Sequence, residues 1–405
     1  MTGPLSHVRV LDLSRVLAGP WASQVLADLG ADVIKIERPG TGDDTRAWGP
    51  PFLRATDGSE TGAGYFLAAN RGKRSITVDL RSPEGQEIVR RIAARSDVVL
   101  ENYRVGTLDK FGLGWKHLSA LNDRLIYCSI TGFGQSGPLA PRPAYDFLIQ
   151  AMGGLMSITG TPDGEPGAGP QKVGIPIIDL ITGVYAATAI SAALAGREVS
   201  GKGGHIDMAM LDVAVSLLSN QAMNSLLSGQ VPKRTGNAHP NIQPQRVYAC
   251  RDGDVVLVVG NDEQFARLCD VLGLPGLSDD PGYRTNADRV LNQATLQPLL
   301  EQIFLARDRA EWLERLAEAG VPAGPINSVP EALAEPQVQH RQMARSYAHP
   351  AAGSVRLVMS PFRFDETPLN SDKTPPCLGA HTDEILAEFG FGVQERAVLR
   401  ERSVV

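Results

Sequence analysis

Short apolar runs alternate with longer amphipathic stretches along the first third of the chain. Four- to six-residue runs rich in valine, isoleucine and leucine are typical of buried strands, and the segments between them have the spacing of helices. The predicted strands are residues 8–13, 31–36, 75–80, 98–101 and 125–130, and the predicted helices are residues 21–29 and 83–94. Because strands that alternate with helices form parallel sheets, the pattern predicts an α/β fold.

The pattern changes twice further along the chain. Helices are predicted at 145–152, 181–194 and 211–227 with a strand at 205–208, and residues 228–245 then form a polar loop with several prolines. A strand at 255–259 and helices at 264–271, 296–305 and 309–320 follow, which indicates a smaller second domain. We therefore divide the chain into residues 1–225, 226–330 and 331–405. The last part contains a predicted helix at 330–333, a strand at 355–359 and a helix at 382–389.

Composition narrows the class of protein. The 405 residues carry a net charge of −6 with 43% hydrophobic residues, and no basic excess points to nucleic acid or an anionic membrane surface. The four cysteines are far apart and show no zinc spacing, so we expect reduced thiols and no metal site. The N-terminal residues have no signal-peptide pattern, and we expect no apolar run of membrane-spanning length. Together these features predict a cytoplasmic protein without a membrane partner.

One carboxylate stands out because it closes an apolar run. Asp179 follows Gly174-Ile-Pro-Ile-Ile178 and precedes a helix-length segment rich in small residues. The N–H groups of a first helical turn stabilise an anion, so we expect Asp179 to stay charged. A charged carboxylate in apolar surroundings is a candidate covalent nucleophile. The alternative is that Asp179 is only the helix N-cap, a position that aspartate favours.

Five basic residues lie next to three of the predicted strands. Arg38 and Arg104 follow two strands, and Arg71, Lys73 and Arg74 form a cluster before another. Open α/β sheets bind ligands at the carboxyl ends of their strands, and arginine makes bidentate bonds to phosphate. The alternative for such residues is a solvated surface.

Two other kinds of site are disfavoured by the sequence. Glu37 lies where a dinucleotide-binding fold places its ribose-binding acid, but the turn after the first strand lacks the GxGxxG glycines. No GxSxG sequence marks a nucleophilic serine.

The chain resembles the family III coenzyme A transferases of the CaiB/BaiF type over nearly its whole length. Six segments in the order and spacing of the family carry the resemblance: VLDLS (10–14), GADVIKIERPG (30–40), NRGKRS (70–75), LENYR (100–104), SITGFG (129–134) and LGAHT (378–382). The resemblance implies a Rossmann-like large domain that includes both ends of the chain, an inserted smaller α+β domain, and an interlinked homodimer.

The resemblance also implies an activity. Asp179 matches the catalytic aspartate, which forms an acyl anhydride and then an aspartyl-CoA thioester while CoA moves to a free carboxylic acid. Residues that match Arg38, Lys73, Arg74 and Arg104 surround coenzyme A, which is a substrate rather than a permanent cofactor. Arg71 is a further candidate because it belongs to the same basic cluster. His381, in the LGAHT segment, is expected to be structural.

Departures from the family pattern bear on the substrate. The formyl-CoA enzymes carry glutamine where this chain has Leu17, which argues against formyl or oxalyl specificity. Related racemases use a histidine where this chain has Tyr145, and racemisation needs a base on each face of the α-carbon. Residues 237–320 resemble members that use succinyl-CoA and dicarboxylic acids, which makes Asn237 and His239 candidates for binding the acid. His239 is equally well explained as an ordinary surface histidine. A 2-methylacyl-CoA isomerase and a catalytically silent CoA-binding protein remain as alternatives.

Overall fold

The computed structural model describes residues 3–365, 369 and 373–405. The chain divides into two compact units. Unit 1 contains Met1–Leu155, Lys172–Gly229 and Gln337–Val405, and unit 2 contains Met156–Gln171 and Gln230–Pro336. These divisions lie within about six residues of 225/226 and 330/331, where the sequence places them. The segment 156–171, which the sequence assigns to the large domain, belongs to unit 2.

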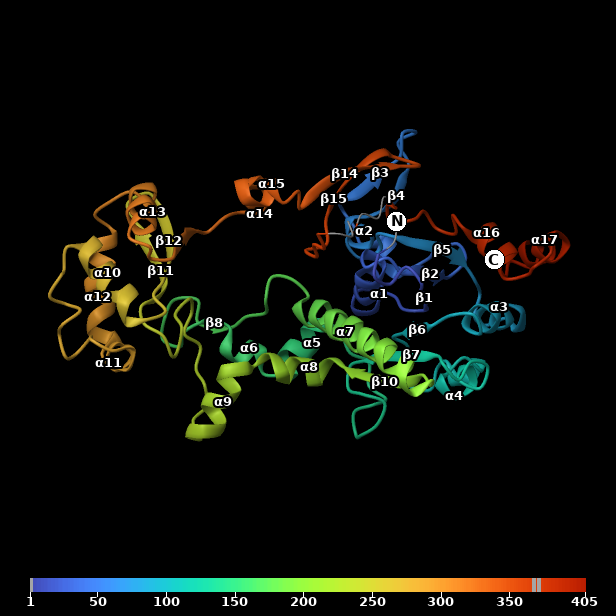
Figure 1. The fold of residues 1–405 in the computed structure, drawn as a ribbon, viewed down its shortest axis with the longest axis horizontal. Coiled ribbons are helices and arrows are strands. Elements are labelled where there is room, and N and C mark those ends of the chain that lie inside the picture. The colour runs from blue at the N-terminus through green and yellow to red at the C-terminus, as the bar shows by residue number, and fades with distance from the viewer. Residues whose placement is uncertain (1–2, 366–368, 370–372) are drawn as a thin grey trace. The chain divides into compact units, whose positions relative to one another are not determined.

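Unit 1 is built on a six-stranded sheet in which every pair is parallel, as the sequence predicts (Figure 1). Its strands, in spatial order, are β10 (Gly204–Ala209), β7 (Ile126–Thr131), β6 (Val98–Glu101), β1 (Arg9–Asp12), β2 (Asp32–Glu37) and β5 (Lys73–Thr77). The chain builds outward from β1 through β2 to β5, and then returns to β6 on the other side of β1. This is the order of a doubly wound sheet, and its switch point lies between β1 and β6.

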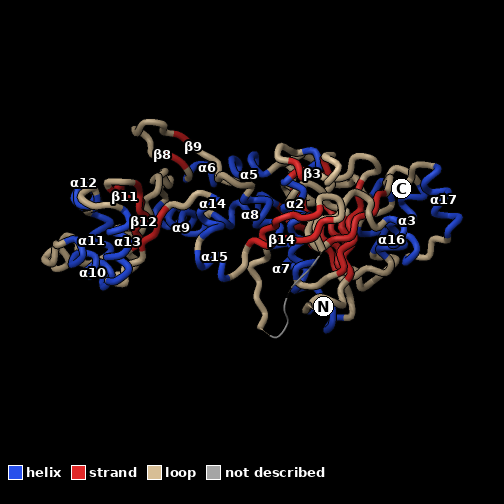
Figure 2. Tube along the Cα trace, turned by 90° about the horizontal axis from the view of Figure 1, so that it is seen from above, coloured by secondary structure: helices blue, strands red, loops and turns tan. Residues whose placement is uncertain are grey.

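Helices cover both faces of the sheet. Successive strand residues point to opposite faces, so Val10 and Val33 enter one core and Leu11 and Ile34 the other. Helices α1 (Ala18–Asp28) and α7 (Ile177–Ser200) supply the first core. Helices α3 (Pro83–Ala93), α16 (Thr382–Glu388) and α17 (Val393–Glu401) supply the second, and Figure 2 shows them together on one side of the strands. The C-terminal segment therefore completes the core of unit 1.

Helix α7 is longer than the predicted 181–194. It has 24 residues with the length and apolar composition of a membrane span, so the expectation that no apolar run approaches this length is wrong. Ile178, Ala186 and Ile190 are nevertheless buried in the core of unit 1. Gly183 permits the contact with α1, because a Cβ there would lie 2.8 Å from the carbonyl oxygen of Ala18. The small residues of α7 thus serve close helix packing.

The predicted helix 211–227 is two helices, α8 (Met210–Leu217) and α9 (Ser219–Ser228), because Ser219 has a positive φ of 44° that interrupts the helix. The remaining elements before α7 are η1 (Asp44–Ala47), β3 (Phe52–Arg54), β4 (Glu60–Ala63), α2 (Gly64–Ala69), η2 (Asp109–Phe111), α4 (Trp115–Leu118), α5 (Asp146–Met152), α6 (Leu155–Ile158), β8 (Gly160–Thr161) and β9 (Gly169–Pro170). Helix α15 (Pro336–His340) and the hairpin of β14 (Ala344–His349) and β15 (Gly353–Val358) precede α16.

Unit 2 has its own core around an antiparallel sheet of β11 (Gln245–Cys250), β12 (Gly253–Val258) and β13 (Ala323–Pro325). The same unit contains the helices α10 (Asp262–Leu272), α11 (Asn286–Leu291), α12 (Gln293–Phe304), α13 (Arg309–Glu318) and α14 (Val329–Ala334). Trp312 is buried against Phe304, whose carbonyl accepts the indole N–H at 2.8 Å. A core of this size explains why the hydrophobic pattern of this region reads as a separate domain.

Candidate active site

The turn after β1 is held by a buried ion pair. Lys35 donates to the carbonyl oxygen of Ser14 at 2.8 Å and to Asp43 at 2.9 Å, and both charged side chains are about 1% exposed. The carboxylate of Asp43 also accepts the backbone N–H of Val16 at 3.2 Å. Lys35 and Asp43 therefore hold the backbone of residues 14–16 in place at the switch point of the sheet.

Val16 lies in a conformation that valine rarely adopts. Its φ is 70°, in the left-handed region where a β-branched side chain is a genuine outlier. Such strain persists only when surrounding contacts over-determine it, and it is concentrated at functional sites. The contacts of Lys35 and Asp43 supply that constraint, and the side chain of Val16 lines a pocket.

A second buried ion pair supports the same turn. Asp12 accepts from Lys73 at 3.2 Å and from the backbone N–H of Ser14 at 2.9 Å, and neither charged side chain is exposed. Burial would raise the pKa of Asp12, but the charges of Lys73 and Lys35 outweigh it and lower that pKa. Burial lowers the pKa of Lys73 to about 8. Lys73 also donates to Asn70 and to the carbonyl oxygen of Pro20, so its three hydrogens are all used inside the fold.

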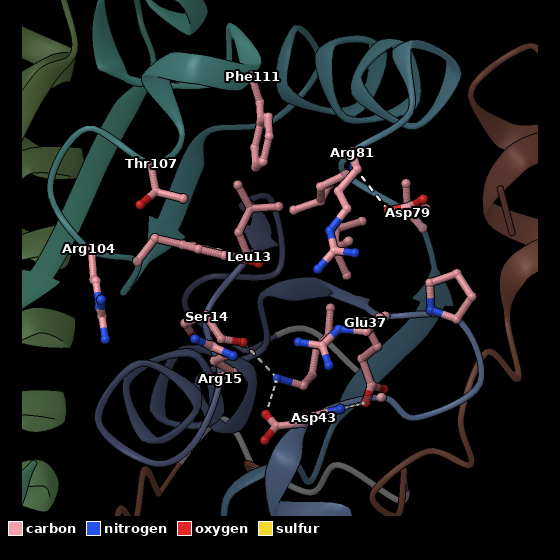
Figure 3. A pocket seen from close by; sticks show the side chains of 18 of the residues that line it. Leu13, Ser14, Arg15, Glu37, Asp43, Asp79, Arg81, Arg104, Thr107 and Phe111 are labelled. Atoms are coloured by element: carbon pink, nitrogen blue, oxygen red, sulfur yellow. Dashed lines mark hydrogen bonds and ion pairs between the residues drawn. The ribbon is translucent and has the colours of Figure 1, made fainter. Parts of the chain in front are cut away.

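Two adjoining pockets open at the carboxyl ends of the strands. The first, which we call the β2 pocket, has a volume of about 540 Å³ and is lined by residues after β1, β2, β5 and β6, including Arg38. Figure 3 shows Arg81 and Arg104 among the lining residues. The second, the Asp179 pocket, has a volume of about 170 Å³. Arg15, Tyr103 and Arg104 line both pockets. The two pockets therefore adjoin within unit 1.

The Asp179 pocket combines apolar walls with cationic groups. Its apolar walls come from the turn after β1, the end of β7 and the start of α8; they include Val16, Leu17, Ala18, Ile130 and Met210. Asp179, Arg15, Arg104 and Arg142 are its charged lining residues. The pocket thus combines one carboxylate residue with three arginines and several apolar side chains.

The carboxylate of Asp146, rather than Asp179, caps helix α7. The first helical residue is Ile177, so Asp179 is the third residue of the first turn and the N-cap position is Pro176. Asp146 accepts the backbone N–H groups of Ile178 at 2.7 Å and of Asp179 at 3.2 Å. The N-cap interpretation of Asp179 is therefore wrong, and its side chain carries no capping hydrogen bond.

Burial raises the pKa of the Asp179 carboxyl group and therefore favours its neutral form. Burial, and next the like charge of Asp146, raise the pKa of Asp179 to about 7. The expectation from the helix N-terminus, that the carboxylate is firmly charged, is therefore wrong: the two N–H groups nearest to it already bond Asp146. Burial, with the charges of Asp179 and Asp146, also raises the pKa of the nearby Tyr65 to about 12.

The structure brings only two of the five predicted phosphate-binding residues to this region. Arg38 and Arg104 are exposed and line the β2 pocket. Arg71 is buried in a bidentate ion pair with Asp28 and donates to the carbonyl oxygen of Val358. Arg71 lines neither pocket, and we withdraw it as a phosphate-binding candidate.

The same correction applies to the other two members of the basic cluster. Arg74 is buried and bonds the carboxylates of Asp32, Glu384 and Glu388. Lys73 bonds Asp12 and has no exposed surface. Neither lines the β2 pocket or the Asp179 pocket, because each charge is already paired with carboxylates of the fold. We therefore withdraw both as phosphate-binding residues.

The two residues predicted to bind the acid, Asn237 and His239, both lie in unit 2, but they do not line the same pocket. Asn237 lines a polar pocket of about 540 Å³ that also contains Arg246. His239 does not line that pocket; its Nδ1 accepts the backbone N–H of Asn241 at 3.1 Å. Their assignment to the acid stays a prediction.

The contacts of Glu37 and His381 bear on two further interpretations of the sequence. Arg46 bonds both oxygens of Glu37 at 2.7 Å, and the hydroxyl of Ser75 donates to the same carboxylate. Glu37 is thus occupied within the fold and is not free to bind a ribose. His381 accepts the backbone N–H of Ser75 through Nδ1, which ties the start of α16 to β5, as expected for a structural residue.

Sequence reasoning missed several residues of the pocket. Arg15 was not singled out although it follows β1, Arg142 lies in a loop far from any strand end, and Tyr145 was considered only as a substituted histidine. Asp146 was missed as the cap because it is 31 residues before α7 in the chain. In the described ranges no group of three or more His, Cys, Asp or Glu side chains is arranged to hold a metal ion.

The chain is similar to known proteins over nearly its whole length. Residues 5–382 match the family model described as CoA-transferase family III. The chain is 49% identical over 386 residues to a succinate–glutarate CoA-transferase of Agrobacterium fabrum, with 95% of this chain and 96% of that protein covered. It is 43% identical over 385 residues to the human succinyl-CoA:glutarate CoA-transferase, covering 95% and 86%. A crystal structure of a CaiB/BaiF family protein from Brucella suis superimposes with a TM-score of 0.84 at 48% identity, covering 96% and 100%.

Proposed function

Because this chain belongs to CoA-transferase family III, we propose that Asp179 carries an acyl group and then coenzyme A while CoA moves from an acyl-CoA to a dicarboxylic acid. The observation that supports this mechanism is that two pockets of unit 1 adjoin. The β2 pocket offers Arg38 and Arg104 to phosphate groups, and the Asp179 pocket offers a buried carboxylate. Arg15, Tyr103 and Arg104 line both pockets.

Coenzyme A requires such a pair of pockets. Its nucleotide end carries a 3′-phosphate and a pyrophosphate, and arginine recognises phosphate through paired N–H groups. Its other end carries a thioester on a narrow chain. We place the nucleotide in the β2 pocket against Arg38 and the thioester in the Asp179 pocket.

The proposed reaction proceeds through two kinds of covalent intermediate. An oxygen of Asp179 attacks the thioester carbonyl, the C–S bond breaks, and CoA leaves as a thiolate. The thiolate attacks the aspartyl carbonyl of the mixed anhydride, which releases the first acid and leaves an aspartyl-CoA thioester. The acceptor carboxylate displaces the thiolate to form a second anhydride, and the thiolate then takes the new acyl group and restores Asp179.

The pocket walls suit these intermediates. An anhydride is destroyed by water, so the site must exclude it during the exchange. Leu17, Ile130 and Met210 are buried apolar residues around Asp179. A carboxylate whose pKa is about 7 is partly ionised at neutral pH, which makes it available as a nucleophile.

We assign a succinyl-like donor and a dicarboxylic acceptor on the basis of the relatives named above. The test is a panel of succinyl-, acetyl- and butyryl-CoA against glutarate, succinate, butyrate and oxalate, with the CoA products measured by mass spectrometry. We expect succinyl-CoA with glutarate to give the fastest exchange. Transfer restricted to monocarboxylic acids would overturn the dicarboxylate assignment and leave CoA transfer intact.

The two alternative functions make different predictions in the same assay. An isomerase exchanges the α-proton of 2-methylacyl-CoA into heavy water without any acceptor acid, and Tyr145 stands where a racemase has its histidine. A silent protein binds CoA and accelerates nothing. Exchange of the α-proton without CoA transfer would favour the first, and binding without either reaction would favour the second.

We also propose that the chain forms a homodimer and that unit 2 is an inserted domain. Helices α5, α7, α8 and α9 expose large apolar side chains, of which Leu226, Leu227 and Val199 are at least 77% exposed. Exposed apolar residues of this number mark an interaction surface. Light scattering should give twice the chain mass of 43.3 kDa, and the double substitution Leu226→Glu with Leu227→Glu should shift the mass toward one chain. A wild-type mass of one chain at micromolar concentration would overturn the dimer.

A further inference from the structure

We propose that Arg142 binds the distal carboxylate of a dicarboxylic acyl group while the other end of that group reacts at Asp179. This inference rests on the proposed function, because it names the residue that distinguishes dicarboxylic from monocarboxylic substrates. It assigns to Arg142 a role in recognition rather than in the chemical step.

The position of Arg142 separates it from the other cationic groups. Three arginines line the Asp179 pocket: Arg15, Arg104 and Arg142. Arg15 and Arg104 also line the β2 pocket, where the CoA phosphates are proposed to bind. Arg142 lines the Asp179 pocket alone, so its charge belongs to the acyl end of the binding region.

The contacts of Arg142 leave its charge available. Arg15 forms an ion pair with Asp44 at 3.1 Å and lies over the ring of Tyr103. Within the described part of the chain Arg142 has no carboxylate partner; its guanidinium lies 5.7 Å from the ring centre of Phe133. Its backbone N–H bonds the carbonyl oxygen of Leu139 at 2.9 Å, which fixes its position in the loop between β7 and α5.

The chemistry of a dicarboxylic acyl group requires a cation at this place. The reacting carboxyl loses its charge when it becomes an anhydride or a thioester, but the distal carboxylate keeps its charge throughout. Beside Asp179 and Asp146 that second negative charge is repelled, and a guanidinium removes the repulsion through charge-assisted hydrogen bonds. Donor and acceptor acyl groups form their anhydrides with the same carboxyl carbon of Asp179 in turn, so one arginine serves both.

The first half-reaction tests this without an acceptor. The rate of CoA loading onto the protein is measured with succinyl-CoA and with butyryl-CoA, which has no distal carboxylate. We expect Arg142→Gln to lower the second-order rate constant for succinyl-CoA by roughly 10- to 100-fold, the scale of a charge-assisted hydrogen bond. The constant for butyryl-CoA should change less than about threefold, and Arg142→Lys should restore part of the loss.

Two comparison variants show whether the effect belongs to Arg142. Arg15→Gln should slow both donors alike, because Arg15 lines both pockets and is not confined to the acyl end. Arg54→Gln, at an exposed side chain outside both pockets, should change neither. Equal losses for both donors in Arg142→Gln, or no loss for either, would overturn the assignment.

The acceptor side gives a second, independent readout. Glutarate and its monomethyl ester share one free carboxylate, but the distal group is charged in glutarate and a neutral, slightly larger ester in the other, so their ratio of kcat/KM reports recognition of the distal carboxylate. Arg142→Gln should bring this ratio close to one, mainly through KM. A wild-type enzyme that does not prefer glutarate contradicts the dicarboxylate function itself, whereas a preference that survives Arg142→Gln contradicts only the role of Arg142.

Discussion

Asp179→Ala is expected to abolish CoA transfer, with a loss of at least roughly 10⁴-fold, the scale seen when a covalent nucleophile is removed. The reason is that, among the residues that the structure describes, no other carboxylate lines the Asp179 pocket. Asp179→Asn should be nearly as damaging, since an amide does not form the anhydride. The fold should survive both changes, because the cap of α7 is supplied by Asp146.

The covalent intermediate gives the direct measurement. Wild-type enzyme incubated with succinyl-CoA and no acceptor should gain CoA on the peptide that contains Asp179, and hydroxylamine should discharge it because a thioester carbonyl is electrophilic. Asp179→Ala should show no adduct. A rapid quench that finds no adduct in enzyme proven active on the same donor would mean direct attack of the acceptor on the thioester.

The pH dependence of adduct formation follows from the same residue. The nucleophile is the carboxylate, so the rate for free enzyme should rise as pH passes through about 7 and level off above it. Asp146→Asn keeps a carbonyl oxygen for the α7 cap and removes the like charge beside Asp179. Its profile should therefore move to lower pH, and a profile unchanged by this substitution would contradict the electrostatic coupling between the two carboxylates.

Lys73→Met is expected to destabilise the fold by about 3–5 kcal/mol, the cost of removing one partner of a buried ion pair. Methionine nearly matches the length of lysine but leaves Asp12 fully buried without its ammonium partner. Asn70 and the carbonyl oxygen of Pro20 lose their donor as well. The midpoint of urea unfolding should fall accordingly, and CoA affinity measured under conditions where the variant is folded should change little.

Arg38→Gln is the matched comparison and should behave in the opposite way. Arg38 is exposed and lines the β2 pocket, so its loss should leave the unfolding midpoint nearly unchanged. CoA affinity should fall by about 1.5–3 kcal/mol, the scale of a charge-assisted hydrogen bond. If Lys73→Met instead weakened CoA binding at unchanged stability, the assignment of Lys73 to the interior would be wrong.

Local pattern predicted the sheet well because each strand carries its own signal. The run at 98–101 coincides with β6, and the predicted helix 83–94 differs from α3 by one residue. Alternation of these elements implies a parallel sheet by itself. The break between α8 and α9 was invisible because Leu218 and Ser219 are compatible with a helix, and only the positive φ of Ser219 interrupts it.

Charged residues separate what the sequence determined from what the tertiary structure decided. The sequence identified Asp179 and Arg38 because an acid at a helix start and an arginine after a strand are local features. It also predicted that Lys73 binds phosphate, although Arg38 follows β2 whereas Lys73 begins β5. Only the folded chain brings Asp12 into an ion pair with Lys73, whereas Arg38 lines a pocket. The state of Asp179 likewise depended on Asp146, 33 residues away, because the charge of a carboxyl group is set by the burial and the neighbours that folding creates.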